Sequence, residues 1–190
     1  ISVNDVLTNF SGLDKLGSIG EEVYIGESPG LTSFEGLDSL RTIGGWLEIY
    51  DCASLESLDG LEGLEHISSM LKIVQCSALQ SLEGLVNLTS IDGYLEISQN
   101  NALVSLEGLD NLEASSISSL FIGENEQLSI CAISSICNYI GTEDADITIY
   151  NNADGCNTTE EVESICSSND ISERSPDPVT FLYPNPTKDR

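Results

Sequence analysis

The stretch IDGYLEISQNNALVSLEGL, residues 91–109, contains the pattern that decides the fold. Its Leu95 and Ile97 alternate with polar residues, which indicates a short strand with one buried face. The stretch closes on a Gly-Leu pair, and this pair recurs every 24 residues along the chain. A unit of 24 residues cannot bury its apolar side chains alone, so stacked units are expected. The pairs begin at Gly12, Gly36, Gly60, Gly84 and Gly108.

The alternating apolar pair also recurs in register, and an insertion at 113–116 displaces only the last copies. This unit resembles the receptor L-domain type of leucine-rich repeat, which also occurs in bacterial surface proteins. The resemblance covers roughly residues 1–168 and implies a repeat solenoid, a right-handed parallel β-helix of about 24 residues per coil. It also implies a scaffold for binding, since such repeats carry many unrelated ligands. The pairs are Val23/Ile25, Leu47/Ile49, Leu71/Ile73, Leu95/Ile97, Leu120/Ile122 and Ile147/Ile149.

Four segments follow from these patterns: the solenoid at 1–128, a Cys-rich C-terminal cap at 129–168, a linker at 169–178 and a tail at 179–190. Two helices are expected in the cap, where they would cover the open edge of the solenoid. The apolar spacing between Ile133 and Ile140, with Gly141 as a stop, predicts the first helix. Asn157 with Glu160 resembles a capping box and predicts the start of the second.

The tail gives a second resemblance. The stretch FLYPNPTKD, residues 181–189, follows a proline-rich linker and looks like the opening of the C-terminal sorting domain of Bacteroidetes type IX secretion. Tyr183, Pro184, Asn185 and Pro186 carry the match. The resemblance implies a protein that is secreted or held at the outer-membrane surface, with a sorting domain cut short at Arg190. An ordinary tail is the alternative.

The cysteines fall into two groups. Cys131, Cys137, Cys156 and Cys166 lie in the cap, where two disulfides are expected because small elements with little core need covalent links. Three pairings are possible. The pairing of Cys137 with Cys166 and Cys131 with Cys156 is favoured, because a bond between the two helices would stabilise the cap most. A zinc site is the alternative, and it is disfavoured because no histidine lies nearby.

Cys52 and Cys76 share one repeat column with Ser28, Asn100 and Asn125, a column expected to point inward. Stacked units lie about 4.8 Å apart, slightly too far for a relaxed disulfide, so two buried thiols are favoured over a bond.

Strand alternation predicts that one sheet face carries most of the aromatic residues, together with the single Trp and the single Met. Such a patch is typical of a contact site, although large side chains also stabilise sheets by packing across strands. The candidate ligand-binding residues are Tyr24, Trp46, Glu48, Tyr50, Met70, Lys72, Tyr94, Glu96 and Phe121.

A second column is acidic and contains Glu35, Asp59, Glu83 and Glu107. Stacked carboxylates repel one another unless water, salt or a cation screens them, so these residues are weak candidates for calcium ligands. A solvated acidic face is the alternative, and no other cofactor is expected.

The composition limits the function. Thirty-two acidic residues against six basic ones give a net charge of -26, which excludes nucleic acid as a partner. No apolar run of about 18 residues is present, so no membrane span is expected. The pattern contains no Ser/His/Asp set with suitable neighbours, which argues against an enzyme.

The sequence therefore predicts a non-catalytic extracellular or cell-surface adhesion module that binds a protein or a polysaccharide. A structural spacer that displays other domains is the alternative, and a carbohydrate-active enzyme is a distant third. The sequence does not predict an oligomeric state.

Overall fold

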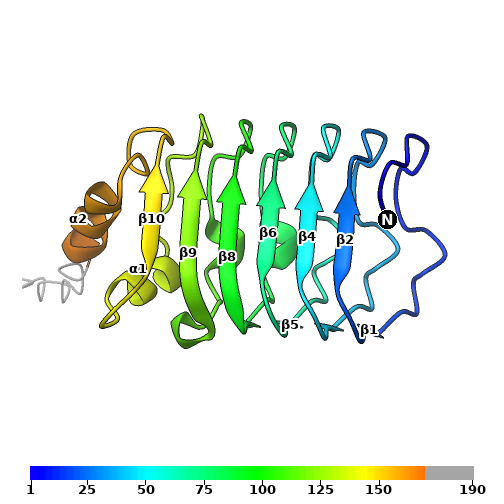
Figure 1. Cartoon of the computed structure of the whole chain (residues 1–190), viewed down its shortest axis with the longest axis horizontal. Helices are drawn as coiled ribbons and strands as arrows, with labels where there is room; N and C mark the ends of the chain where they lie inside the picture. Colours follow the sequence, from blue (N-terminus) through cyan, green and yellow to red (C-terminus); the bar gives the residue numbers. More distant parts are fainter. Residues whose placement is uncertain (170–190) are drawn as a thin grey trace, which may run out of the picture.

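The computed structural model describes residues 1–169, which form an elongated array of parallel strands (Figure 1). The N-terminus lies at one end of the array and helix α2 (Thr159–Asn169) at the other. The tail at 179–190 and the linker beyond residue 169 lie outside the described residues. Within residues 1–169, no helix has both the length and the apolar character that crossing a membrane requires.

The larger sheet contains six parallel strands in the order β10-β9-β8-β6-β4-β2. Neighbouring strands pair at the repeat spacing, so Leu71 lies between Leu47 and Leu95. Gly93 pairs with Ile117 and Tyr94 with Ser119, so Ser118 of β9 is an extra residue that forms a bulge. The repeat spacing of 24 is kept as far as Ile117, so the inserted residue is Ser118 and not one of 113–116 as predicted. The strands are β2 (Val23–Gly26), β4 (Leu47–Tyr50), β6 (Leu71–Val74), β8 (Gly93–Ser98), β9 (Ile117–Gly123) and β10 (Ile147–Tyr150).

The smaller sheet contains four strands of two residues each, in the order β1-β3-β5-β7. Turns and three short 3-10 helices connect the two sheets. The smaller strands are β1 (Ser18–Ile19), β3 (Thr42–Ile43), β5 (His66–Ile67) and β7 (Ser90–Ile91), and the 3-10 helices are η1 (Glu83–Leu85), η2 (Glu107–Leu109) and η3 (Ala114–Ser116).

Leucine and isoleucine side chains from successive units form one continuous core. The repeated glycine is explained by how closely the units stack. A Cβ atom at Gly84 would collide with the carbonyl group of Leu58, and one at Gly108 with that of Leu82. Only glycine permits this approach, so its recurrence follows from packing.

The predicted fold class, a leucine-rich-repeat or L-domain-like right-handed parallel β-helix, is wrong. The described residues form two open parallel sheets of six and four strands with two helices, an α/β-like arrangement in which neither sheet closes. The second side of each unit has only two paired residues, and the remainder consists of turns and 3-10 helices. Between the two sheets, successive units are joined by isolated backbone hydrogen bonds, such as Phe34 N to Asp59 O at 2.8 Å and Gln80 N to Glu56 O at 3.2 Å, and not by a continuous ladder.

One interior column is polar and connects successive units by hydrogen bonds. The backbone N–H of Cys76 donates to Asn100 Oδ1 at 2.9 Å, and the N–H of Asn100 donates to Asn125 Oδ1 at 2.9 Å. Cys52 and Cys76 are buried free thiols, which confirms the preference stated from the sequence. The column contains Ser28, Cys52, Cys76, Asn100, Asn125 and Asn152.

The C-terminal segment contains both expected disulfides, and the favoured pairing is confirmed. Cys137 on α1 (Ser134–Ile140) is bonded to Cys166 on α2, and Cys131 is bonded to Cys156. Helix α1 ends before Gly141 as predicted.

The start of the second helix differs from the prediction by one residue. The Oγ1 atom of Thr158, not the side chain of Asn157, accepts the hydrogen bond from the N–H of Glu161 at 3.2 Å. The Glu161 carboxylate in turn accepts from the backbone N–H of Asn157 at 2.9 Å and of Gly155 at 2.7 Å. Thr158 is the better cap because Glu161 lies three residues after it, and Glu160 is not used in this way.

Candidate functional site

The outer face of the six-stranded sheet brings the predicted ligand-binding residues together. Strand register places five of them in one row across neighbouring strands, and all nine are half-buried. The row is Tyr24, Glu48, Lys72, Glu96 and Phe121.

A charged pair occupies the centre of this face. Lys72 Nζ lies 3.1 Å from Glu96 Oε2 and 5.6 Å from the centroid of the Tyr94 ring. The side chains of Lys72 and Glu96 are only 27% and 17% exposed, so solvent screens this pair less than an ordinary surface pair. Burial, reinforced by Glu96, raises the pKa of Tyr94 to about 12, so its hydroxyl stays protonated at neutral pH.

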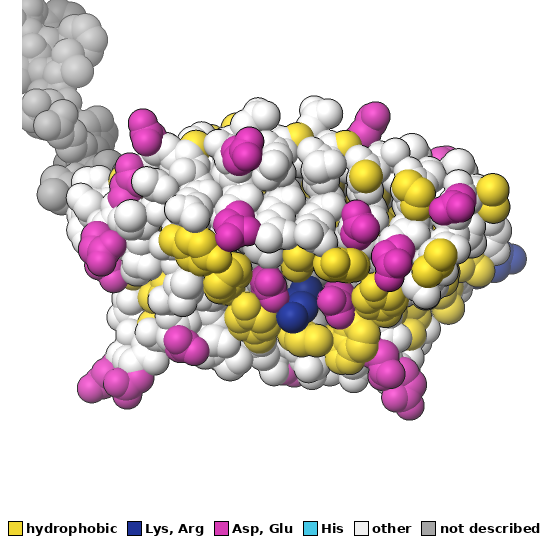
Figure 2. Space-filling view, turned by 45° about the horizontal axis from the view of Figure 1, so that its top comes forward, with side chains coloured by type: hydrophobic (Ala, Val, Ile, Leu, Met, Phe, Trp, Pro, Cys, Tyr) yellow, Lys and Arg dark blue, Asp and Glu magenta, His cyan; other side chains and the backbone are white. Residues whose placement is uncertain are grey.

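Aromatic pairs lie on either side of this centre. Tyr24 packs edge-to-face with Trp46 at 6.4 Å between ring centroids, and Phe121 packs in the same way with Tyr150 at 5.5 Å. Figure 2 shows hydrophobic side chains gathered in a belt that is interrupted by a basic side chain between acidic ones. Burial raises the pKa of Tyr24 and of Tyr150. Sequence analysis missed Tyr150, although its alternation with Ile149 was a usable signal.

Two glycines of the sheet lie beneath aromatic rings. A Cβ atom at Gly26 would collide with the Tyr24 ring, and one at Gly123 would lie 3.0 Å from the Tyr150 ring. The rings therefore cover backbone that has no side chain of its own, which stabilises the sheet whether or not a ligand binds.

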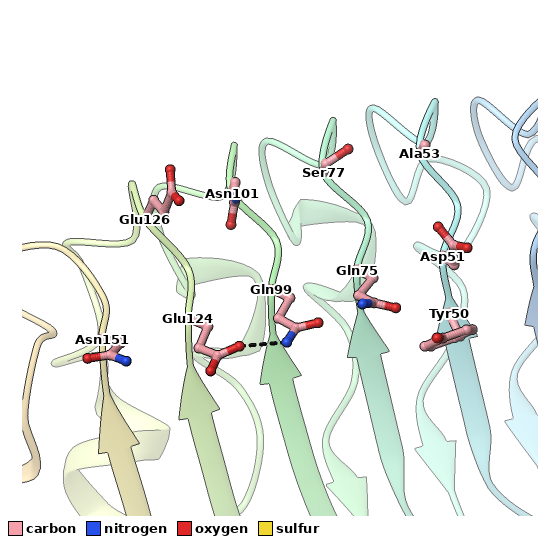
Figure 3. A pocket seen from close by; sticks show the side chains of 10 residues that line it. All are labelled: Tyr50, Asp51, Ala53, Gln75, Ser77, Gln99, Asn101, Glu124, Glu126 and Asn151. Atoms are coloured by element: carbon pink, nitrogen blue, oxygen red, sulfur yellow. Dashed lines mark hydrogen bonds between the residues drawn. The ribbon is translucent and has the colours of Figure 1, made fainter.

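A polar hollow of about 830 Å³ lies beyond the carboxyl ends of the same strands (Figure 3). Ligands commonly bind at this end of open parallel sheets. Sequence analysis missed the hollow, although polar residues at 51, 75 and 99 share the spacing of 24. The lining residues are Tyr50, Asp51, Ala53, Gln75, Ser77, Gln99, Asn101, Glu124, Glu126 and Asn151.

The residue that follows each strand of the larger sheet has a left-handed backbone conformation. Residues other than glycine rarely adopt this backbone conformation, because it costs them about 1 kcal/mol relative to glycine. In all of these residues except Asn151, the backbone N–H donates to a carbonyl of the next unit, for example Gln75 N to Ser98 O at 3.1 Å. The residues, with their φ angles, are Glu27 (48°), Asp51 (50°), Gln75 (60°), Gln99 (58°), Glu124 (60°) and Asn151 (53°).

Within the hollow, Glu124 is held by two neighbours. Gln99 Nε2 donates to Glu124 Oε2 at 2.5 Å, the bond drawn in Figure 3, and the Tyr150 hydroxyl donates to Oε1 at 3.4 Å. The carboxylate is therefore fixed in orientation, and Gln99 presents its amide oxygen to the hollow.

The acidic column lies on another surface of the array. Glu35, Asp59, Glu83 and Glu107 are all exposed, and the last three line a hollow of about 450 Å³. Among residues 1–169, no group of three or more His, Cys, Asp or Glu side chains is placed to hold a metal ion. Calcium binding by this column remains a prediction.

Four polar side chains meet on the smaller sheet. His66 Nδ1 lies 2.5 Å from Ser90 Oγ, and its Nε2 lies 3.0 Å from Ser68 Oγ and 3.5 Å from Asp92 Oδ2. Stacking brings Ser90 from the next unit beside His66, a contact that the sequence pattern did not reveal. The Asp92 side chain is 56% exposed, and none of the four residues lines either hollow. This arrangement therefore lacks the enclosed site that activates a nucleophile.

Fold and surface together define a class: a repeat protein of two open parallel sheets, with an aromatic outer face and a polar hollow at the strand ends. Comparisons with protein-family models, with curated proteins and with solved structures found no match to the chain. The resemblance to the receptor L-domain family therefore remains a prediction from the repeat residues.

Proposed function

We propose that the chain is a non-catalytic binding module that presents the outer face of its six-stranded sheet to an extracellular protein or polysaccharide. The observation that carries the proposal is the gathering of aromatic pairs on both sides of the Lys72 and Glu96 ion pair. Aromatic rings on a sheet supply a large contact area at a small entropic cost, because few bonds must be fixed.

Compartment and charge support this proposal. The two disulfides are typical of proteins that fold in an oxidising environment. A net charge of -26 repels anionic partners, which favours neutral or basic ones. Export by type IX secretion to the surface of a Bacteroidetes-type bacterium is part of the proposal and rests on the resemblance at 181–189.

A structural spacer is the second candidate, and a specific observation favours it. The rings above Gly26 and Gly123 stabilise the sheet without any ligand. A spacer needs the aromatic residues only for folding, whereas a binding module needs them also for contact with its partner.

The test is a glycan and extracellular-protein array probed with the full chain, with calcium and again with a chelator. Trp46→Ala is expected to weaken a specific signal at least about tenfold. Val104→Ala is the matched control, because Val104 is 43% exposed and lies outside this face. Binding that is unchanged in Trp46→Ala, or absent from both buffers, would favour the spacer. A binding signal that is lost in the chelator would indicate that calcium bound by the acidic column contributes to binding.

A further inference from the structure

The hollow at the strand ends offers hydrogen-bonding groups of both kinds. The Gln75, Gln99 and Asn151 amides supply donors and acceptors together, and Asp51 supplies further acceptors. Figure 3 shows these side chains in a row across neighbouring strand ends, with Tyr50 at one end of the row. Adjacent hydroxyl groups of a sugar both donate and accept, so they match such a row better than a purely apolar ligand does.

Backbone conformation gives a separate argument. Gln75 and Gln99 have φ angles of 60° and 58°, where glycine would be the most stable residue. Gln99 uses its side chain to hold Glu124, but the Gln75 side chain makes no hydrogen bond with the described residues, so folding gives no reason for a long polar side chain at Gln75. A disfavoured conformation that is retained in a hollow points to a use for the side chain itself.

Charge and spacing define the ligand further. The ten lining residues include three carboxylates, those of Asp51, Glu124 and Glu126, and no Lys or Arg. An anionic polymer would be repelled, and a neutral one would not. Neighbouring strands lie about 4.8 Å apart, so the groups recur along a line, as the rings of an extended polysaccharide do.

We propose that this hollow binds a linear, uncharged polysaccharide that runs across the strand ends. Its hydroxyl groups hydrogen-bond with Gln75, Gln99 and Asn151, and one sugar ring stacks on Tyr50. Glu124, held by Gln99 at 2.5 Å and by Tyr150 at 3.4 Å, fixes the orientation of the Gln99 amide. This inference rests on the proposed binding function and names the ligand class for a surface adjoining the aromatic face.

The experiment is affinity electrophoresis of the full chain in gels that contain a soluble β-glucan, a xylan or a mannan, with polygalacturonate as the anionic comparison. Gln75→Gly is the decisive variant, because glycine adopts the required backbone conformation more readily than glutamine. It is expected to unfold at the same or a higher temperature and to bind at least about fivefold more weakly. Gln80→Ala, at an exposed glutamine outside the hollow, is expected to bind as the wild type does.

Three results would overturn the proposal: retardation by none of the neutral polymers, equal retardation by polygalacturonate, or unchanged binding in Gln75→Gly. Each is distinguishable from failure of the proposed function. A protein ligand lost in Trp46→Ala, together with no retardation by any neutral polymer, would preserve the binding role of the sheet face and overturn the polysaccharide proposal. Neutral-polymer binding that is lost in Trp46→Ala but kept in Gln75→Gly would place the site on the face alone.

Discussion

The N-terminal and C-terminal units differ most in the interior polar column. In the C-terminal units, Asn125 receives and donates at once: its Oδ1 accepts from the Asn100 N–H at 2.9 Å, and its Nδ2 donates to Ile97 O at 3.0 Å. In the N-terminal units, sulfur replaces the amide, and Cys52 Sγ lies 3.6 Å from Tyr50 O and 4.0 Å from Ile25 O. The same repeat position is therefore filled by amides that bond to neighbouring units in one half. In the other half it is filled by two weakly bonding thiols and by the Ser28 hydroxyl, which donates within its own unit to Gly26 O at 3.0 Å.

This difference teaches that a regular repeat need not have uniform stability. Thiols are weak donors and acceptors, whereas a buried amide with all its bonds made holds neighbouring units together. The disulfides lie in the C-terminal half as well. We therefore expect local opening to begin in the N-terminal units, as regions with fewer strong contacts open first.

The largest effect is expected from removing a central amide. Asn125→Ala would leave the N–H of Asn100 and the carbonyl of Ile97 buried without their partner. The free energy of unfolding should fall by about 3–5 kcal/mol, because each unsatisfied group costs about 1–3 kcal/mol. Urea unfolding followed by circular dichroism measures this loss. Ser28→Ala is the matched change in the N-terminal half and should cost about 1 kcal/mol; equal costs would refute the comparison.

A slightly smaller loss of stability is expected from removing the disulfide that joins α1 to α2. The bond between Cys137 and Cys166 closes a loop with a sequence separation of 29, so its loss should cost about 3–4 kcal/mol. The double variant Cys137→Ala/Cys166→Ala should show faster amide exchange in α1 and α2, with little change in β2 and β4. Equal acceleration in all strands would mean that the two halves unfold as one unit, and the proposed gradient would then be wrong.

The sequence predicted the features that depend on residues close together in one unit. Alternation located Leu95 and Ile97, and helical spacing located α1, because burial of one face requires those periods. The inward column was also predictable, since the position five residues after the first residue of each strand pair recurs in register, as in Leu95 and Asn100. Pairing of the four cysteines in the cap followed from the need to join two small helices.

The remaining features depend on how separate units meet, and local patterns do not record this. The fold class was wrong because two-residue strands such as Thr42–Ile43 leave too short an alternation to define a second sheet. The hollow was missed because Gln75 and Gln99 occupy left-handed positions where glycine or asparagine would have indicated a turn. The contact of His66 with Ser90 joins two units across a sequence separation of 24, so the pattern within one unit does not predict it.

The smallest effect is also the one that tests the column most directly. Cys76→Asn would add one amide to the interior polar column, with its oxygen placed to accept the backbone N–H of Cys52 as Asn100 Oδ1 accepts that of Cys76 at 2.9 Å. The neighbouring Asn100 shows that the column accommodates an amide at this depth. Stability should rise by about 1 kcal/mol at neutral pH, measured as a higher urea midpoint with an unchanged slope. A lower midpoint would show that the N-terminal units are too tightly packed for the larger side chain.

The pH dependence of the same variant sharpens the result. A hydrogen bond with Cys52, together with burial, raises the pKa of Cys76 above its ordinary value. Above about pH 8.5 the unfolded chain loses the thiol proton of Cys76, whereas the folded chain keeps it. The contribution of Cys76 to stability is therefore complete below about pH 8.5 and declines as the pH rises further. Cys76→Asn lacks this group, so its advantage over the wild type should grow between neutral pH and about pH 9.5. An advantage that stays constant would mean that the thiol is not protected in the folded state, and the difference between the two halves would then lie in packing and not in hydrogen bonding.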